Sequence, residues 1–363
     1  MRTMEVFLLA AFAAGAPGVA QDAVESSIDS IFAALADAKS PGFAVLVHKD
    51  GRTVFERGYG VADLRSLRKI DVKTDFRLAS FTKQFTAMSI MLLVRDGKLR
   101  YDEPITDVFT EFPTYGRAIT IRHLLTHTGG LPDYEDLMGP TWTARHQIQD
   151  DEVLSLLEHQ IALKFAPGTK WAYSNSGYVV LGLIVAKASG EPFWQFLHDR
   201  IFGPLGMGQT IAFVKGTNIA PHRAFGHTKE SGGFVETDQS PTSATLGDGG
   251  VYSNLEDLAK WDAALAAHTL LGEKEMREAL APVKLNDQSE PTAEGKPVSY
   301  GFGWFLDPYK GHPRMWHSGS TLGFRTVIDR FTNEKVTVVI LCNRTDVDPS
   351  ELALKVVDTL WKL

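Results

Sequence analysis

Residues 76–95 read FRLASFTKQFTAMSIMLLVR, a stretch in which most residues are apolar. A helix over Thr82–Arg95 would carry apolar residues on most of its sides, and Gly97 is placed to end it, so the sequence predicts a buried helix. Ser80 stands at its N-terminal end, and Lys83 follows one turn later on the same face. A lysine in an apolar interior needs a partner or a function. We therefore expect Ser80 to be a nucleophile that Lys83 helps to activate.

The Ser-x-x-Lys spacing is weak evidence by itself, because a chain of 363 residues contains about one such match by chance. Ser66 and Lys69 form a second match. The two matches differ in their surroundings, since Ser66 lies in a charged loop whereas Ser80 opens a buried helix. The context favours Ser80 as the reactive residue.

A second polar motif, Tyr173-Ser-Asn175, offers a phenol for proton relay and an amide that binds substrate. The same pattern occurs at Tyr252-Ser-Asn254. That copy has a structural explanation, because Ser253 and Glu256 have the spacing of a capping box that opens a helix over residues 255–266. We therefore expect Tyr173 and Asn175 to be the functional pair.

A third motif, His317-Ser-Gly319-Ser320, comes just before a predicted strand at residues 324–329. Its glycine permits close approach of the backbone to a ligand. His127-Thr-Gly129 repeats the pattern, but it more simply ends the helix that precedes it. We expect the motif at residues 317–320 to line a binding site.

Strand-like segments lie at the two ends of the chain and helix-like segments in its middle. Asp50-Gly51 between two β-like runs is a strong hairpin signal. Helices are expected at residues 22–38, 82–95, 121–125, 152–162, 178–188, 255–266 and 350–363, and strands at 43–48, 53–59, 300–305, 324–329 and 336–341. The pattern predicts an α/β architecture in which helices flank an antiparallel sheet. A mainly helical second lobe would leave a cleft for a site.

The three motifs together, in this order, resemble the penicillin-recognising serine enzymes. That family includes class C β-lactamases, D,D-carboxypeptidases, D-aminopeptidases and β-lactamase-like esterases. The resemblance spans nearly the whole chain and rests on residues 76–80, 120–131, 173–178, 249–253 and 319–324. It implies a β-lactamase/transpeptidase-like fold over residues 21–363. Its sheet lobe would take approximately residues 21–78 and 241–363, and its helical lobe approximately residues 79–240.

The resemblance also implies a role for each motif. Ser80 is similar to the acyl-accepting nucleophile of the family, and Lys83 with Tyr173 to the coupled pair that deprotonates it and later activates water. Asn175 is similar to a residue that binds the substrate amide. The backbone N–H groups of Ser80 and Ser320 would form the oxyanion hole.

One position departs from the β-lactamases of this family. Their third motif usually begins with a lysine, a permanent cation that can hold the carboxylate of a substrate, whereas this chain has His317. A histidine is only partly charged near neutral pH. Binding of a substrate carboxylate by His317 is therefore less assured, and we expect less efficient β-lactam hydrolysis. A peptide, a D-amino-acid amide, an ester and a β-lactam all remain open as substrates.

Composition excludes several classes of protein. A net charge of −7 and a pI near 5.9 argue against a nucleic-acid partner. Cys342 is the only cysteine, so no intrachain disulfide forms, and it ends a strand-like run that would bury it. We expect a small-molecule or short-peptide substrate and neither a cofactor nor a metal.

The first twenty residues have the pattern of a secretory signal peptide. Arg2 precedes an apolar run at residues 6–16, and small residues at 17–20 suit cleavage. The run is short for a membrane-spanning helix. We expect a secreted or periplasmic protein with no stable membrane anchor once the signal is removed.

Three alternatives remain to be weighed. A non-hydrolytic penicillin-binding-type receptor or pseudoenzyme would keep the same residues but would not turn over. A metallohydrolase could use His123 and His127 as ligands on one helical face, but the Glu of H-E-x-x-H is missing. An α/β-hydrolase is disfavoured, because the chain has no G-x-S-x-G motif.

Overall fold

A five-stranded antiparallel sheet forms the centre of the protein in the computed structural model, which describes residues 17–35 and 37–362. The strand order is β12-β13-β14-β1-β2. The strands are β1 (Phe43–Lys49), β2 (Arg52–Tyr59), β12 (Met315–Thr321), β13 (Phe324–Phe331) and β14 (Val336–Cys342). The two ends of the chain meet where β1 pairs with β14, from Phe43 opposite Cys342 to Lys49 opposite Val336. The predicted sheet built from both ends of the chain is confirmed.

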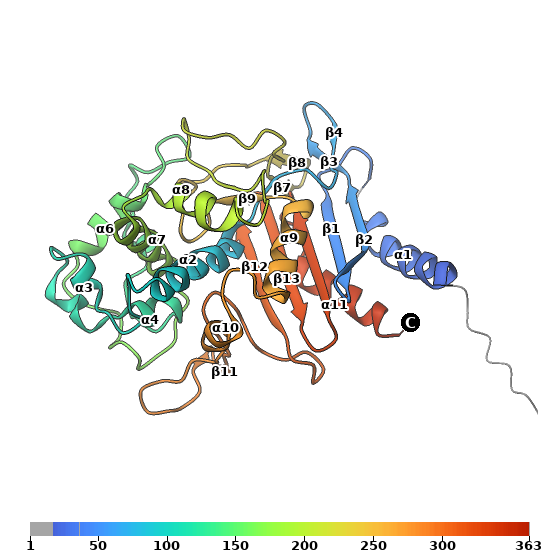
Figure 1. Cartoon of the computed structure of the whole chain (residues 1–363). Helices are drawn as coiled ribbons and strands as arrows, with labels where there is room; N and C mark the ends of the chain where they lie inside the picture. The colour runs from blue at the N-terminus through green and yellow to red at the C-terminus, as the bar shows by residue number, and fades with distance from the viewer. Residues whose placement is uncertain (1–16, 36, 363) are drawn as a thin grey trace, which may run out of the picture.

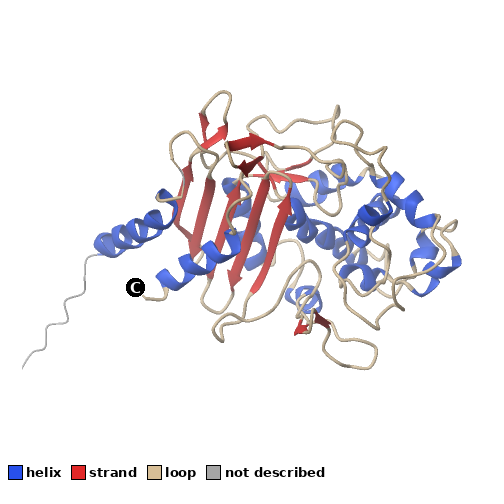
Figure 2. Ribbon diagram, turned by 180° about the vertical axis from the view of Figure 1, so that it is seen from behind, coloured by secondary structure: helices blue, strands red, loops and turns tan. Residues whose placement is uncertain are grey.

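Both faces of this sheet are covered, which explains why β1 and β14 read as continuous apolar runs. Successive side chains of a strand point to opposite faces. Accordingly, Val45 packs in a cluster with α1 (Pro17–Ala33) and α11 (Pro349–Leu360), whereas Ala44 and Leu46 belong to the larger core on the other face. Figure 2 shows α11 running across its face of the sheet. On the other face, α9 (Leu255–Ala266) contacts β1 and β14.

The hairpin predicted at Asp50-Gly51 joins β1 to β2. Both residues have positive φ, +52° and +74°, as the tightest hairpin turns require. The turn between β12 and β13 likewise uses Gly323 at φ +82°.

The middle of the chain forms a mainly helical lobe. Figure 1 shows α3, α4, α6 and α7 gathered at the end of the molecule opposite α1 and α11. Helix α2 (Lys83–Arg95) is buried along most of its length, as predicted, and packs against α7 (Asn175–Ser189). The other helices of the lobe are α3 (Ile105–Val108), α4 (Ile121–Leu125), α5 (Tyr134–Leu137), α6 (Asp150–Glu158) and α8 (Phe193–Leu197).

Short strands and one more helix complete the chain. Strand β9 pairs with β5 and β6, which fixes the backbone just before Ser80. These shorter elements are β3 (Val61–Asp63), β4 (Arg68–Lys69), β5 (Phe76–Arg77), β6 (Ile211–Ala212), β7 (His227–Glu230), β8 (Gly233–Glu236), β9 (Val251–Ser253), β10 (Thr292–Ala293), β11 (Lys296–Pro297) and α10 (Glu273–Ala279).

Three local predictions were wrong. Residues 300–305 form a tight turn rather than a strand, in which the N–H of Gly301 donates to the carbonyl of Trp304 at 2.8 Å. The edge strand β12 replaces it in the sheet. The first helix ends at Ala33, not at residue 38. Helix α9 is capped by the side chain of Asn254 rather than by Ser253.

The described part of the chain contains no helix that is both long and apolar enough to cross a membrane. Of the predicted export signal, residues 1–20, the first sixteen residues lie outside the part of the chain that the structure describes. Its last four residues form the start of α1.

Candidate active site

Ser80 lies in a single 3-10 turn, Ala79–Thr82, that leads directly into α2. The turn is held on both sides. On one side the N–H of Leu78 donates to the carbonyl of Val251 in β9 at 2.8 Å, and on the other the Thr326 hydroxyl of β13 donates to the carbonyl of Leu78 at 2.7 Å. Ala79, immediately before the serine, has a left-handed backbone with φ +50°. Such a conformation is uncommon for a residue with a Cβ and concentrates at functional sites.

Lys83 is completely buried and directs its ammonium at Ser80. Nζ donates to Ser80 Oγ at 3.1 Å, to Asn175 Oδ1 at 2.9 Å and to the carbonyl of Asp248 at 2.8 Å. All three protons of the ammonium therefore have acceptors, which is how a buried cation is tolerated. A half-buried hydroxyl and a desolvated amine thus lie within hydrogen-bond distance.

Tyr173 and Asn175 come from the segment that enters α7, and both lie next to Lys83. The centroid of the Tyr173 ring is 4.9 Å from Lys83 Nζ. The amide of Asn175 bridges two charges, since Oδ1 accepts from Lys83 and Nδ2 donates to Glu135 Oε1 at 3.2 Å. Folding therefore brings the first two predicted motifs together around one ammonium.

The third motif lies on β12, and its residues are placed differently from one another. Gly319 faces the turn that carries Ser80: a Cβ there would be 2.0 Å from the carbonyl oxygen of Leu78 and 2.5 Å from Thr326 Oγ1. Only glycine allows β12 to come this close to the turn. Ser320, the next residue, is exposed and lines the cavity in front of Ser80.

His317 is buried behind this surface rather than exposed to a ligand. Its Nε2 is 3.1 Å from the hydroxyl of Tyr300, and its Nδ1 is 2.7 Å from the carbonyl of Ser318. Burial, together with the nearby charge of Lys83, lowers the pKa of His317 to about 3. The imidazole is therefore neutral near pH 7, which differs from the partial charge expected of an ordinary histidine. Its side chain supplies no cation to the cavity.

A cavity of about 260 Å³ opens in front of Ser80. It is lined by side chains from both lobes: Arg77, Ala79, Ser80, Tyr134, Glu135, Asn175, Ser240, Thr242, Thr245, Asp248, Gly249, Ser320, Thr321 and Leu322. The site therefore lies where the helical lobe meets the sheet, as expected for a cleft between two lobes.

Two carboxyl groups give this cavity an acidic side. Desolvation raises the pKa of Glu135, and the neighbouring carboxylates of Asp133 and Asp248 raise it further. Asp248 is buried; its Oδ2 accepts from the hydroxyl of Tyr134 at 3.1 Å, while Oδ1 has no hydrogen-bond partner among the described residues. A cationic group entering the cavity would find acceptors there.

Comparison with known proteins agrees with this geometry. The sequence model of the family described as Beta-lactamase matches residues 28–359. The chain belongs to the beta-lactamase family. Penicillin-binding protein 4* of Bacillus subtilis (strain 168) is 31% identical over an alignment of 343 residues that covers 90% of this chain and 73% of that protein. The predicted family, the β-lactamase/transpeptidase-like fold and the assignment as a serine hydrolase enzyme are confirmed.

Two further relatives carry other names. The D-aminopeptidase of Gluconobacter oxydans (strain 621H) is 27% identical over 311 residues, and the match spans 84% of this chain but only 56% of that protein. The crystal structure of D-amino acid amidase from Ochrobactrum anthropi SV3, complexed with L-phenylalanine amide, superposes with a TM-score of 0.81. It is 25% identical and the match covers 93% of this chain and 99% of that one. The chain thus shares its fold with the solved structure of a protein named D-amino acid amidase.

The alternative motifs that begin at Ser66 and Tyr252 lie apart from the site, and the predicted histidine pair forms no metal site. The hydroxyl of Ser66 donates to Asp63 Oδ2 at 3.1 Å, and Lys69 donates to the carbonyl of Ala38, so these residues have partners of their own. Asn254 caps α9. The side chains of His123 and His127 have different partners, Thr120 and Ser174, and no metal-ligating cluster of three or more residues occurs in the part of the chain that the structure describes.

Three residues at the site escaped the sequence analysis. Asp248 immediately precedes the recognised segment 249–253, and Glu135 follows the recognised segment 120–131, but neither carries a signal of its own. His127 was interpreted as the end of a helix, yet its ring centroid is 4.4 Å from that of Tyr173. Only tertiary contacts distinguish such residues from ordinary surface or core positions.

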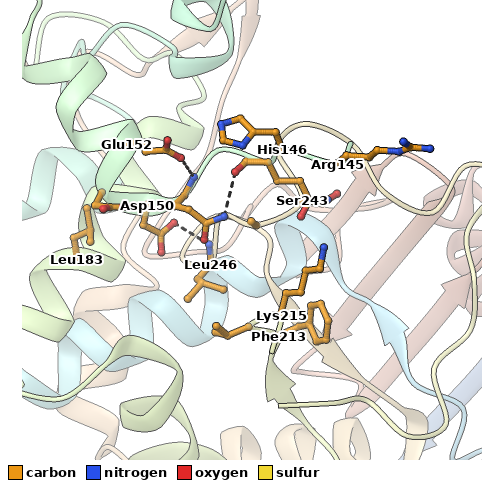
Figure 3. A pocket seen from close by; sticks show the side chains of 14 residues that line it. Arg145, His146, Asp150, Glu152, Leu183, Phe213, Lys215, Ser243 and Leu246 are labelled. Atoms are coloured by element: carbon orange, nitrogen blue, oxygen red, sulfur yellow. Dashed lines mark hydrogen bonds between the residues drawn. The ribbon is translucent and has the colours of Figure 1, made fainter. Parts of the chain in front are cut away.

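A second and larger cavity, of about 730 Å³, lies on the other side of the segment 240–248. Ser243 and Leu246 line this cavity, whereas Thr245 and Asp248 line the one in front of Ser80. Figure 3 shows Asp150 hydrogen-bonded to the backbone of Leu246, at 3.0 Å. None of the predicted site residues lines this larger cavity. The size of a cavity therefore does not identify the candidate active site of this protein.

Proposed function

We propose that this protein hydrolyses an amide or ester through an acyl-enzyme on Ser80. The observation that carries the proposal is the 3.1 Å contact between Ser80 Oγ and the buried Nζ of Lys83. In the first step Oγ bonds to the substrate carbonyl carbon while its proton passes to the coupled Lys83–Tyr173 pair, which enters the step one proton short, as a neutral amine or a phenolate. That pair returns the proton to the leaving group as the scissile bond breaks. Water then attacks the acyl-enzyme by the same route in reverse.

The developing oxyanion needs donors in front of Ser80. We assign this role to the backbone N–H groups of Ser80 and Ser320, because the exposed residue on β12 borders the same cavity. Donors fixed by a strand and a turn require little reorganisation during the reaction. The tight packing of Gly319 against Leu78 holds β12 at a fixed distance from the turn that carries Ser80.

The choice of nucleophile is tested with matched serines. Ser80→Ala should abolish turnover and covalent labelling by a fluorescent penicillin or a fluorophosphonate, because no other hydroxyl contacts Lys83 within the described residues. Ser66→Ala should leave both unchanged. Loss of labelling in Ser66→Ala with retention in Ser80→Ala would show that the wrong motif was chosen.

The acidic side of the cavity supports a substrate that carries an amine. The carboxyl groups of Glu135 and Asp248 border the cavity. Of the cationic residue types nearby, Arg77 donates a hydrogen bond to the carbonyl of Gly249, and His317 is neutral and does not line the cavity. A free ammonium group on an amide substrate would therefore be bound better than a carboxylate. Among the open substrate classes, we infer D-amino-acid amides and short peptides with a free N-terminal D-residue, in keeping with the D-aminopeptidase and amidase relatives.

A pair of substrates tests this preference. D-Alaninamide should be hydrolysed with a kcat/KM at least about tenfold above that of N-acetyl-D-alaninamide, which lacks the charge. Glu135→Gln should reduce the preference by lowering kcat/KM for the free amine only. Equal rates for the two substrates would contradict the amine-binding proposal while leaving the role of Ser80 intact.

A second candidate is a penicillin-binding receptor that acylates without turnover. The curated relatives named penicillin-binding proteins favour it, at 31% and 30% identity. A receptor would release one equivalent of product and then stop. A steady rate after the first turnover, measured with p-nitrophenyl esters, D-amino-acid amides, D-Ala-D-Ala peptides and nitrocefin, would exclude it.

The predicted signal at residues 1–20 supports export to the periplasm or the medium. Expression of the full chain in a Gram-negative host, followed by fractionation and N-terminal sequencing, tests this proposal. A mature chain that begins near Gln21 in the periplasmic fraction is expected. An intact N-terminus in the cytoplasmic fraction would contradict it.

A further inference from the structure

Tyr173 lies in a segment without regular structure. Residues 171–174 belong to no helix or strand, and α7 begins only at Asn175. No backbone ladder therefore fixes the direction of the Tyr173 ring. If its hydroxyl is to relay a proton at Lys83, contacts from elsewhere in the fold must hold it.

His127 supplies such contacts to three consecutive residues. Its carbonyl accepts from the N–H of Ala172 at 3.0 Å, and its Nδ1 accepts from the N–H of Ser174 at 3.1 Å. Between them, the imidazole lies against the Tyr173 ring, with centroids 4.4 Å apart and planes inclined by 35°. One side chain and its own backbone thus hold the residues before, at and after the phenol.

The backbone of His127 takes an unusual conformation to make these contacts. Its φ is +59°, in the left-handed region that few residues with a side chain adopt. The ring is buried, and within the described residues its Nε2 has no hydrogen-bond partner. A strained backbone and an unpartnered ring nitrogen on one residue are local costs of the kind found at functional sites.

The contact with Ser174 also defines the state of the ring. Because a backbone N–H donates to Nδ1, that nitrogen must carry a lone pair, and the proton of the neutral imidazole is on Nε2. Burial lowers the pKa of His127 well below its usual value, and the charge of Lys83 lowers it further. The imidazole therefore stays neutral while it accepts from Ser174.

Backbone hydrogen bonds that do not involve the His127 side chain join residues 128–130 to residues 164–168. The carbonyl of Thr128 accepts from the N–H of Gly168 at 2.9 Å, and that of Gly130 accepts from Lys164 at 2.8 Å. A substitution at residue 127 should therefore loosen Tyr173 while the chain keeps its fold. This separation makes the function of the imidazole testable.

We propose that His127 is a positioning residue that holds the Tyr173 phenol in place beside the Lys83 ammonium, whose Nζ is 4.9 Å from the centroid of that ring. It is not among the residues that line the cavity in front of Ser80, and it acts through Tyr173. The proposal rests on the proposed relay role of Tyr173. It adds a residue that the three motifs do not contain.

Two variants separate the contacts that the ring makes. His127→Leu removes both the Nδ1 acceptor and the aromatic packing, and kcat should fall about 100-fold with KM within about twofold, since small misplacements of a reacting group cost this much. His127→Asn keeps an oxygen acceptor for Ser174 and tolerates positive φ, so its loss should be smaller. His123→Leu is the matched control, a half-buried histidine of the same segment that bonds Thr120 instead, and its kcat should be unchanged.

A double-mutant cycle with Tyr173→Phe provides the decisive measurement. Phenylalanine keeps the ring but removes the hydroxyl, so in that background His127→Leu should change kcat by less than about threefold. Additive losses would overturn the positioning role while leaving Tyr173 as a relay. Full activity in Tyr173→Phe alone would overturn both the relay and this proposal. Thermal unfolding verifies that each variant is folded, and if His127→Leu is not, His127→Asn takes its place in the cycle.

Discussion

Replacement of Lys83 by methionine separates catalysis from stability. Methionine has a similar length and no branch, but it lacks the ammonium that contacts Ser80, Asn175 and the carbonyl of Asp248. Proton transfer by a positioned group contributes about 10²–10⁴-fold to a rate. Acylation of Ser80 in Lys83→Met should therefore slow by about 10³-fold.

The expected change in stability is small because two large effects oppose each other. Removal of the ammonium leaves two acceptors, Asn175 Oδ1 and the Asp248 carbonyl, without a partner, at about 1–3 kcal/mol each. Removal of a buried charge also abolishes a desolvation penalty of several kcal/mol. The free energy of unfolding should therefore change by less than about 2 kcal/mol in either direction.

The assay is the rate of labelling by a fluorescent penicillin, measured together with urea unfolding of the same variant. Lys69→Met is the control, because Lys69 is an exposed lysine at the same spacing from a serine. An acylation rate within tenfold of the wild type would refute the assignment of Lys83. A loss of more than about 4 kcal/mol of stability would instead indicate a mainly structural lysine.

Three further predictions concern pH and packing. The pKa of His317 is about 3 in the fold against 6.5 when unfolded, so the protein loses stability as pH falls below about 6.5. In urea titrations, His317→Gln should lose less stability than the wild type between pH 7 and pH 4. The pKa of Asp150 is about 8 in the fold, above its usual 3.8, so its ionisation opposes folding as pH rises. Relative to the wild type, Asp150→Asn should gain stability progressively between about pH 4 and pH 8. Gly319→Ala should cost about 1–3 kcal/mol and most activity, whereas Gly208→Ala, with open space around it, should be neutral in thermal unfolding and turnover.

Features that depend on local sequence were predictable. The hairpin at Asp50-Gly51, the buried helix after Ser80 and the strands β13 and β14 all follow from residue patterns within about fifteen positions. The edge strand β12 was not predicted, because its Ser, Gly and Thr residues give little apolar alternation. Residues 300–305 were mistaken for a strand because aromatic residues outnumber the two glycines that make the turn.

The state of the histidines could not be read from the sequence. His317 was expected to be partly charged, but enclosure by Tyr300 and β12, close to Lys83, keeps it neutral. His127 had the same motif as His317 and was interpreted as a helix end, yet it contacts Tyr173. Protonation and partners of an imidazole depend on the groups that surround it in space. Such groups can be far away along the chain, since Lys83 acts on His317 from a position 234 residues earlier.

The sequence by itself determined the family, the order of the three motifs and the pairing of Ser80 with Lys83, because a serine and a lysine three residues apart on a helix must share a face. The tertiary structure alone decided which other groups reach that lysine. Asn175 and Asp248 come from segments 92 and 165 residues away and supply its remaining acceptors. Helical geometry fixes short-range neighbours, whereas contacts between distant segments exist only once both lobes have packed around a common core.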